Sequence, residues 1–276
     1  MQMFQVDAFT DRLFAGNPAA VLILDDWLPE HLMQSIASEN NLAETAFARP
    51  NPSANESGKN SSWELRWFTP THEVNFCGHA TLATAHILAT EHRVQTNMLF
   101  ETRVGTLHVR QSADGYQLDV PAFPPEPLES LPAEIAHIFG TVPAKPFKNF
   151  ENIFAELPSE HAVRNFIPDL HAISQLGTTG LVITAPGAED GAEDGAEHDF
   201  VSRYFVPGAG IPEDPVTGST HATLVPYWAE KLGKTQLSAF QTSVRGGLLI
   251  CELARDRVLI SGHAVTFMEA RLRVST

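Results

Sequence analysis

The sequence predicts an α+β protein of two similar halves, each a strand-rich sheet with one main helix. Both halves carry the same order of elements, namely a strand, a proline, a glycine-bearing loop and a helix. The first copy runs Arg66-Trp67-Phe68-Thr69-Pro70 and then Gly78-His79-Ala80-Thr81-Leu82. The second runs Arg203-Tyr204-Phe205-Val206-Pro207 and then Gly218-Ser219-Thr220-His221-Ala222-Thr223-Leu224. A recurrence of this kind indicates an internal duplication.

The remaining pattern of the first half fits this class. Short apolar or alternating stretches predict strands at 1–10, 19–24, 63–68, 99–110 and 116–120. Helical spacing of Leu32, Met33, Ile36 and Ala37 predicts a helix over 29–40, and a second helix is expected over 80–91. The proline-rich stretch 122–132 is typical of a linker. We therefore place one half at 1–121 together with the last strand, 265–276, and the other at 122–264.

The second half repeats the mixture of short strands and few helices. Strands are predicted at 152–157, 181–184, 200–206 and through the strand-rich end, 246–274; helices are predicted at 135–139, 168–176 and 218–232. The acidic stretch 187–199 reads Gly-Ala-Glu-Asp in near-repeats, so we expect a solvated loop or hairpin tip.

Composition excludes several classes of function. The 276 residues carry a formal net charge of −15, which argues against nucleic-acid binding and against docking on an anionic membrane. A small anionic substrate remains compatible, because a local site can oppose the global field. There is no apolar stretch long enough for a membrane span and no signal-peptide pattern, so the expected location is the cytoplasm. Two cysteines, Cys77 and Cys251, cannot form a disulfide framework.

Two helix starts and one carboxylate carry the candidate chemistry. The glycines Gly78 and Gly218 each open a helix, whose free N–H groups and positive dipole end suit a carboxylate ligand; alternatively they only allow tight turns. Glu44 lies among Leu42, Ala43, Ala46 and Phe47. A carboxylate in such company either pairs with a cation or resists ionisation, which suits a general base at neutral pH. An exposed surface glutamate is the alternative.

Three further residues flank these helix starts. The dipole should lower the pKa of His79 and keep its ring neutral, ready to donate or relay a proton; a structural histidine is the alternative. Asp214 precedes a proline and should be extended, facing the site or ending a turn. Cys77 beside His79 invites a thiolate role, against the alternative of a small buried apolar group. We find no cofactor motif, and the scattered histidines predict no metal site.

Four ordered motifs closely resemble those of the PhzF-like (phenazine biosynthesis) isomerase family, and the resemblance covers nearly the whole chain. They are Asp7-Ala8-Phe9-Thr10 with Phe14-Ala15-Gly16-Asn17-Pro18-Ala19, then Asn41-Leu42-Ala43-Glu44-Thr45-Ala46-Phe47, then Phe68-Thr69-Pro70 with Cys77-Gly78-His79-Ala80-Thr81, and finally Gly210-Ile211-Pro212-Glu213-Asp214-Pro215-Val216-Thr217-Gly218-Ser219. The resemblance implies the diaminopimelate-epimerase-like fold, with the active site between two similar halves.

The resemblance also implies roles for the residues that match the motifs. It implies a cofactor-independent proton shift on a small carboxylate-bearing metabolite, a homodimer, and Glu44 as the acid/base. His79 and Asp214 would assist catalysis, and the substrate-binding residues would be Asn17, Cys77, Gly78, Gly218, Ser219 and Thr220. Related epimerases use one cysteine per half, whereas only Cys77 stands at such a position here. Two alternatives stay open: an epimerase or racemase using Cys77 with a carboxylate, and a non-catalytic metabolite-binding protein.

Overall fold

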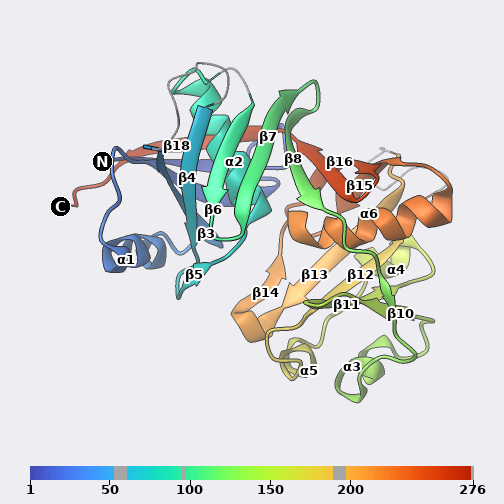
Figure 1. The fold of residues 1–276 in the computed structure, drawn as a ribbon. Helices are drawn as coiled ribbons and strands as arrows, with labels where there is room; N and C mark the ends of the chain where they lie inside the picture. The colour runs from blue at the N-terminus through green and yellow to red at the C-terminus, as the bar shows by residue number, and fades with distance from the viewer. Residues whose placement is uncertain (53–60, 95–96, 189–196, 275–276) are drawn as a thin grey trace. The chain divides into compact units, whose positions relative to one another are not determined.

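The computed structural model describes residues 1–52, 61–94, 97–188 and 197–274, and the chain divides into two compact units (Figure 1). The first unit comprises Met1–Val120 with Ile260–Thr276, and the second comprises Pro121–Leu259. The boundaries between the units therefore follow residues 120 and 259. The sequence-based assignment placed them after residues 121 and 264. Most of the acidic stretch 187–199 lies outside the described residues.

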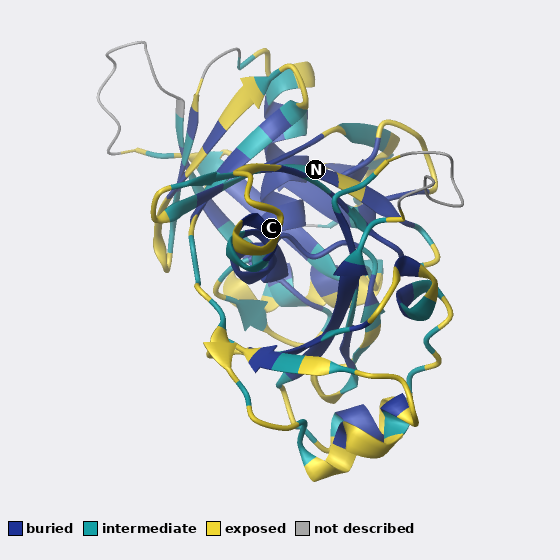
Figure 2. Ribbon diagram, turned by 90° about the vertical axis from the view of Figure 1, so that its right-hand side faces the viewer, coloured by how far each residue is buried: buried dark blue, intermediate teal, exposed yellow. Residues whose placement is uncertain are grey.

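The first unit contains a mixed sheet in the order β18-β1-β2-β3-β4-β6-β7-β8, with parallel pairs β2–β3 and β4–β6 and antiparallel pairs elsewhere. Its strands are β1 (Gln2–Ala8), β2 (Asn17–Ile23), β3 (Glu44–Pro50), β4 (Ser61–Phe68), β6 (Met98–Thr102), β7 (Gly105–Ser112), β8 (Gly115–Pro121) and β18 (Ala264–Arg271). The two-residue strand β5 (Glu73–Val74) pairs with the end of β4. Along single strands the colour in Figure 2 changes between buried and exposed positions, as expected where one face packs on a core.

The helix α2 (Gly78–Thr90) is the centre of the first unit and packs against β1, β2, β3 and β18. It carries no charged residue apart from its histidines and is apolar or small all round, which is the pattern of a fully buried helix. The hydroxyls of Thr81 and Thr84 donate to the carbonyls of Cys77 and Ala80, at 2.6 and 2.7 Å, so their burial leaves no orphaned donor.

The helix α1 (Glu30–Asn40) connects β2 to β3 and covers a second apolar cluster, which includes Met33, Ile36, Phe47 and Phe68. The helix ends at Asn41, whose φ of 52° places it in the left-handed conformation that commonly terminates helices. This abrupt end turns the chain directly into β3. Glu44 is therefore the first residue of a strand rather than part of a helix.

The second unit repeats the strand pattern of the first. The order β10-β11-β12-β13-β15-β16 has the parallel pairs β11–β12 and β13–β15, and its other pairs are antiparallel. The same succession of antiparallel and parallel pairs runs from β1 to β7 in the first unit. The strands are β10 (Lys145–Lys148), β11 (Asn152–Glu156), β12 (Gly180–Pro186), β13 (Phe200–Val206), β15 (Gln236–Gln241) and β16 (Gly247–Ala254). The predicted duplication into two similar α+β halves is thus confirmed.

The remaining elements of the second unit are mostly short. They are β9 (Glu126–Pro127), α3 (Ala133–Ala136), η1 (His137–Phe139), α4 (Glu160–Arg164), α5 (Leu170–Ser174), η2 (Pro207–Ala209), β14 (Ile211–Asp214), α6 (Gly218–Leu232) and β17 (Arg257–Gly262), which enters the first unit. The helix α6 is the counterpart of α2 and is buried over most of its first ten residues. No described helix is long and apolar enough to cross a membrane.

An ion pair is duplicated together with the strands. In the first unit Arg66 of β4 donates from Nε and Nη2 to both carboxylate oxygens of Glu73 in β5, at 2.7 and 2.6 Å. In the second unit Arg203 of β13 binds Glu213 of β14 in the same way, at 2.7 and 3.0 Å. Each guanidinium also lies over the ring of the phenylalanine two residues later. A bidentate pair is geometrically strict, so each pair fixes the loop that leads into α2 or α6.

Candidate active site

The first unit brings five of the predicted site residues together at the start of α2. Asn17 begins β2, Glu44 begins β3, and Cys77, Gly78 and His79 form the entrance to the helix. Because β2 and β3 are parallel, their first residues lie at the same edge of the sheet. The helix starts beside that edge, and all five residues are buried or nearly so.

The approach to Asn17 requires a glycine. Gly16 has a φ of 64°, and a β-carbon there would lie 2.1 Å from the carbonyl oxygen of Ala8. No other residue type fits so close to a backbone oxygen, and a left-handed φ is itself unfavourable for residues with a β-carbon. The glycine therefore lets the chain turn sharply after β1 and delivers Asn17, with no exposed surface, to the site.

His79 is the centre of the cluster. Its Nε2 lies 3.1 Å from Oε2 of Glu44, whose side chain keeps 12% of its surface exposed. Its Nδ1 lies 3.1 Å from the amide nitrogen of Asn17 and 3.5 Å from Sγ of Cys77. One imidazole thus joins three side chains from three different elements, and its ring orientation is fixed from both of its nitrogens.

The direction of the pKa shift of His79 differs from the sequence-based prediction. Burial disfavours the cation, but the contacts with Cys77 and Glu44 outweigh burial and hold the pKa of His79 well above its usual range. The helix dipole predicted the opposite direction, a lowered pKa and a neutral ring. The prediction of a lowered pKa was therefore wrong, because it considered only the helix dipole and not the contacts with Cys77 and Glu44.

Cys77 is a poor nucleophile in this setting. Burial, followed by the neighbouring Glu44 carboxylate, raises the pKa of its thiol to about 11. At neutral pH the thiol is therefore protonated. Cys77 is also the N-cap residue of α2, although its side chain accepts no capping hydrogen bond.

The cluster also contains three different kinds of metal ligand. One atom each from Glu44, Cys77 and His79 lie within 4.8 Å of one another. The sequence predicted no metal site, because its histidines are scattered over both halves. The glutamate beside the Cys-Gly-His segment lies more than thirty residues upstream, so the cluster has no local signature.

The other predicted site residues belong to the second unit and lie around the start of α6. Asp214 ends β14, where it is 8% exposed, and accepts a hydrogen bond from the hydroxyl of Thr217. Gly218, Ser219 and Thr220 form the first turn of the helix, and the Thr220 hydroxyl donates to the carbonyl of Thr217 at 2.9 Å. Thr217 occupies in this unit the N-cap position that Cys77 occupies in the first.

One residue that organises this segment was missed by sequence reasoning. Gln241 is fully buried at the end of β15; its amide donates to the carbonyl of Asp214 at 2.7 Å, and its oxygen accepts from the N–H of Thr217 at 2.8 Å. It therefore clamps both ends of the turn before α6. Gln241 lies outside every motif, so its buried amide could be recognised only after the strand pairing was known.

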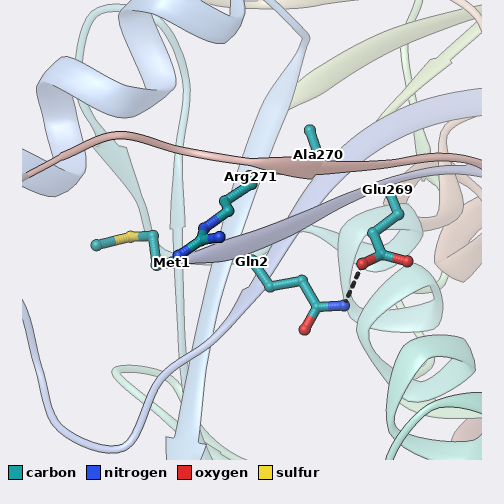
Figure 3. A pocket seen from close by; sticks show the side chains of 5 residues that line it. All are labelled: Met1, Gln2, Glu269, Ala270 and Arg271. Carbon is teal, nitrogen blue, oxygen red and sulfur yellow. Dashed lines mark hydrogen bonds between the residues drawn. The ribbon is translucent and has the colours of Figure 1, made fainter.

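A surface hollow of about 490 Å³ lies elsewhere, over β1 and β18. It is lined by Met1, Gln2, Glu269, Ala270 and Arg271, and Gln2 donates to Glu269 at 2.7 Å across it (Figure 3). None of the predicted site residues lines this hollow. We therefore take the buried cluster around His79 as the candidate active site.

Comparison with known proteins agrees with the motifs. Residues 6–270 match the model of a family described as phenazine biosynthesis-like protein. An uncharacterized isomerase of Pseudomonas aeruginosa is 43% identical over 276 residues, which cover 100% of this chain and 99% of the relative. The crystal structure of a PhzF family protein from Enterococcus faecalis matches with a TM-score of 0.87 at 41% identity, covering 98% of this chain and 99% of that one.

A more distant structural match is an epimerase. A hydroxyproline epimerase from Agrobacterium vitis, solved with bound trans-4-hydroxy-L-proline, matches with a TM-score of 0.58 at 11% identity, covering 98% of this chain and 91% of that one. The predicted epimerase-like fold is therefore confirmed. Since both the family model and the close relatives span nearly all of its length, this chain belongs to the phenazine biosynthesis-like (PhzC-PhzF) family.

Proposed function

We propose that this protein is a cofactor-independent isomerase that moves a proton between two carbons of a small carboxylate-bearing metabolite, with Glu44 as the acid/base. The observation that carries the proposal is the pairing of a nearly buried glutamate with His79 at the start of a buried helix. Relatives named isomerases support the general class of reaction.

The chemistry needs one base that can also return its proton. Glu44 takes a proton from a substrate C–H, and the electron pair that remains spreads into the adjacent unsaturated system of the substrate. The protonated Glu44 then delivers the same proton to the second carbon, so atoms and charge balance without a co-reactant. The enzyme is restored to its starting state after each turnover.

His79 and the helix start would assist these steps. His79, whose Nε2 lies 3.1 Å from the carboxylate, keeps Glu44 oriented before the first transfer. Backbone N–H groups in the first turn of α2 point toward the site and suit the developing negative charge. We propose that Asp214, Gly218, Ser219 and Thr220 of the second unit bind the carboxylate and polar groups of the substrate, as the family resemblance implies. The homodimer and the cytoplasmic location remain predictions.

An epimerase that uses Cys77 as a base is less well supported. Its thiol has a pKa raised to about 11, which leaves almost no thiolate at neutral pH. The corresponding N-cap position of the second unit is Thr217, so a pair of opposed thiols is not available at the two helix starts. These two observations favour the carboxylate mechanism.

The test begins with a thermal-shift screen of carboxylic acids, followed by proton NMR in D2O on each acid that stabilises the protein. For a compound that is turned over, Glu44→Gln should retain binding and lose roughly 100-fold or more in turnover, the usual contribution of a general base. Glu39→Gln, which alters an exposed carboxylate of the same unit, is the control. Normal turnover by Glu44→Gln would contradict the assignment. Ligands that stabilise the protein but are never converted would favour a binding protein.

A further inference from the structure

We propose that Glu44, Cys77 and His79 form a binding site for a divalent transition-metal ion of the Zn²⁺ type. Each residue offers a ligand of a different kind, namely a carboxylate oxygen, a thiolate sulfur and an imidazole nitrogen. Zn²⁺ accepts all three ligand types and is commonly held by three protein groups with a fourth position open. Mg²⁺ and Ca²⁺ require mainly oxygen ligands and do not fit this set.

The distances suit a tetrahedral ion. Nε2 of His79 lies 3.1 Å from Oε2 of Glu44 and 3.9 Å from Sγ of Cys77. Ordinary Zn²⁺ bond lengths and a tetrahedral angle place a nitrogen about 3.4 Å from an oxygen ligand and about 3.6 Å from a sulfur ligand. The oxygen of Glu44 and Sγ of Cys77 lie within 4.8 Å of each other. Side-chain shifts of up to about 1 Å would therefore bring all three atoms to the separations that the ion requires.

The surroundings already provide what a metal-bound histidine needs. When Nε2 of His79 binds an ion, Nδ1 carries the proton and needs a hydrogen-bond acceptor. Metal-bound histidines usually donate this N–H to a neighbouring oxygen. The side-chain amide of Asn17 lies 3.1 Å from Nδ1, and rotation of that amide by half a turn presents its oxygen. Cys77 and His79 are held by the first turn of α2, where Thr81 anchors the carbonyl of Cys77. Two of the three ligands are thus fixed by the helix.

Occupation of this site would switch off the proposed reaction, and this consequence rests on the proposed function. An ion bound to Glu44 shares the oxygen lone pairs that would accept the substrate proton, and it replaces the proton on His79. On binding, the Cys77 thiol and the charged imidazole each release a proton to the solvent, while no electron is transferred. The cluster would therefore act as an inhibitory metal site within the catalytic site.

Cobalt provides a probe of binding that does not depend on turnover. Titration of Co²⁺ into the purified, metal-free protein should give a thiolate-to-cobalt absorption band in the ultraviolet and intense visible bands typical of tetrahedral coordination, saturating at one equivalent. Zn²⁺ should abolish both bands, and Mg²⁺ should leave them unchanged. Because the chain has only two cysteines, Cys251→Ala is a matched control. It removes the other buried thiol and should retain the bands.

Two variants decide whether the assigned residues hold the ion. Cys77→Ala should lose the thiolate band, and Glu44→Gln should weaken Co²⁺ binding by at least about 10-fold, since loss of even an outer partner often costs that much. Circular dichroism confirms that each variant is folded. The proposal is overturned if the unaltered protein gives no thiolate band, if Cys77→Ala keeps it, or if Cys251→Ala loses it.

The metal site and the proposed function can fail separately. If Zn²⁺ binds as described but Glu44→Gln turns over an identified substrate normally, the metal site stands and the acid/base assignment falls. If Glu44→Gln is inactive and no thiolate band forms, the reverse holds. If both stand, Zn²⁺ should inhibit turnover at the same concentration that displaces Co²⁺.

Discussion

His221 predicts a loss of stability in mild acid that can be measured on one variant. The residue lies in the first turns of α6, is fully buried, and makes a 2.8 Å hydrogen bond from Nδ1 to the carbonyl of Thr217. Burial lowers the pKa of His221 to about 4, although the bond to Thr217 favours the proton. The folded protein therefore keeps this ring neutral at pH values where the unfolded chain, with a pKa of about 6.5, becomes charged.

The sign and size follow from these two pKa values. Because the folded pKa is lowered, the unfolded state binds the proton first as the pH falls through about 6.5, and stability is lost from there down to about pH 4. Between pH 7 and pH 5 the unfolded chain is stabilised by about 2 kcal/mol relative to the folded protein through this one group. Burial also lowers the pKa of His86 to about 4, so His86 destabilises the folded protein in the same direction. Its contribution is the same in any variant that changes only His221.

The measurement is urea unfolding at pH 7 and pH 5 for the unaltered protein and for His221→Asn. Asparagine retains an N–H donor for the carbonyl of Thr217 but cannot take up a proton. The loss of unfolding free energy between the two pH values should be smaller by about 2 kcal/mol in the variant. His31→Asn, at an exposed position of α1, is the control and should behave like the unaltered protein. Equal losses in His221→Asn and the unaltered protein would refute the reasoning.

Three further predictions concern the features that position the site. Gly16→Ala should destabilise the protein by about 3 kcal/mol or more, because the new β-carbon would meet a carbonyl oxygen. Gly233→Ala, at nearly the same φ but with open space around it, should cost only about 1 kcal/mol. Equal losses of stability in thermal unfolding would contradict this prediction. Arg203→Lys should lower stability by about 1–3 kcal/mol, since lysine cannot make the bidentate bonds to Glu213, and a change below about 0.5 kcal/mol would show that the pair is dispensable. Cys77 should react with iodoacetamide far more slowly in the native protein than in urea. With a pKa of about 11, only about one Cys77 thiol in a thousand is ionised at pH 8. Equal rates of labelling, measured by mass spectrometry, would show that the thiol is not buried.

Most of the fold could be predicted because its main signals are local. The apolar run of α2 predicts a buried helix, and the alternation of apolar and polar residues in β4 predicts a strand. The recurrence of an Arg-x-Phe strand before a helix that begins with glycine identified the duplication. The strands β10, β14 and β15 were not predicted. Each is four to six residues long and is stabilised by pairing with a partner distant in sequence, which no local pattern encodes.

The residues of the candidate site could be predicted from local motifs, but their contacts with one another could not. Glu44 and His79 were both identified from their own motifs, but their 3.1 Å contact depends on the packing of β3 beside α2. The prediction of a lowered pKa for His79 was wrong because it left out this contact and the contact with Cys77. Gln241 was missed because a buried amide that bonds backbone groups twenty-four and twenty-seven residues away has no signature in its own segment.

The return of β18 to the first unit has a consequence for how the chain is made. β18 pairs with β1 along its whole length, yet it follows the entire second unit in the sequence and is synthesised after it. Until then β1 has an unpaired edge toward the missing strand, and open strand edges favour pairing with other chains. The second unit, built from the continuous segment Pro121–Leu259, is complete earlier. During synthesis the half that begins first is therefore finished last, and truncation near the carboxyl terminus would expose the edge of the half that contains Glu44.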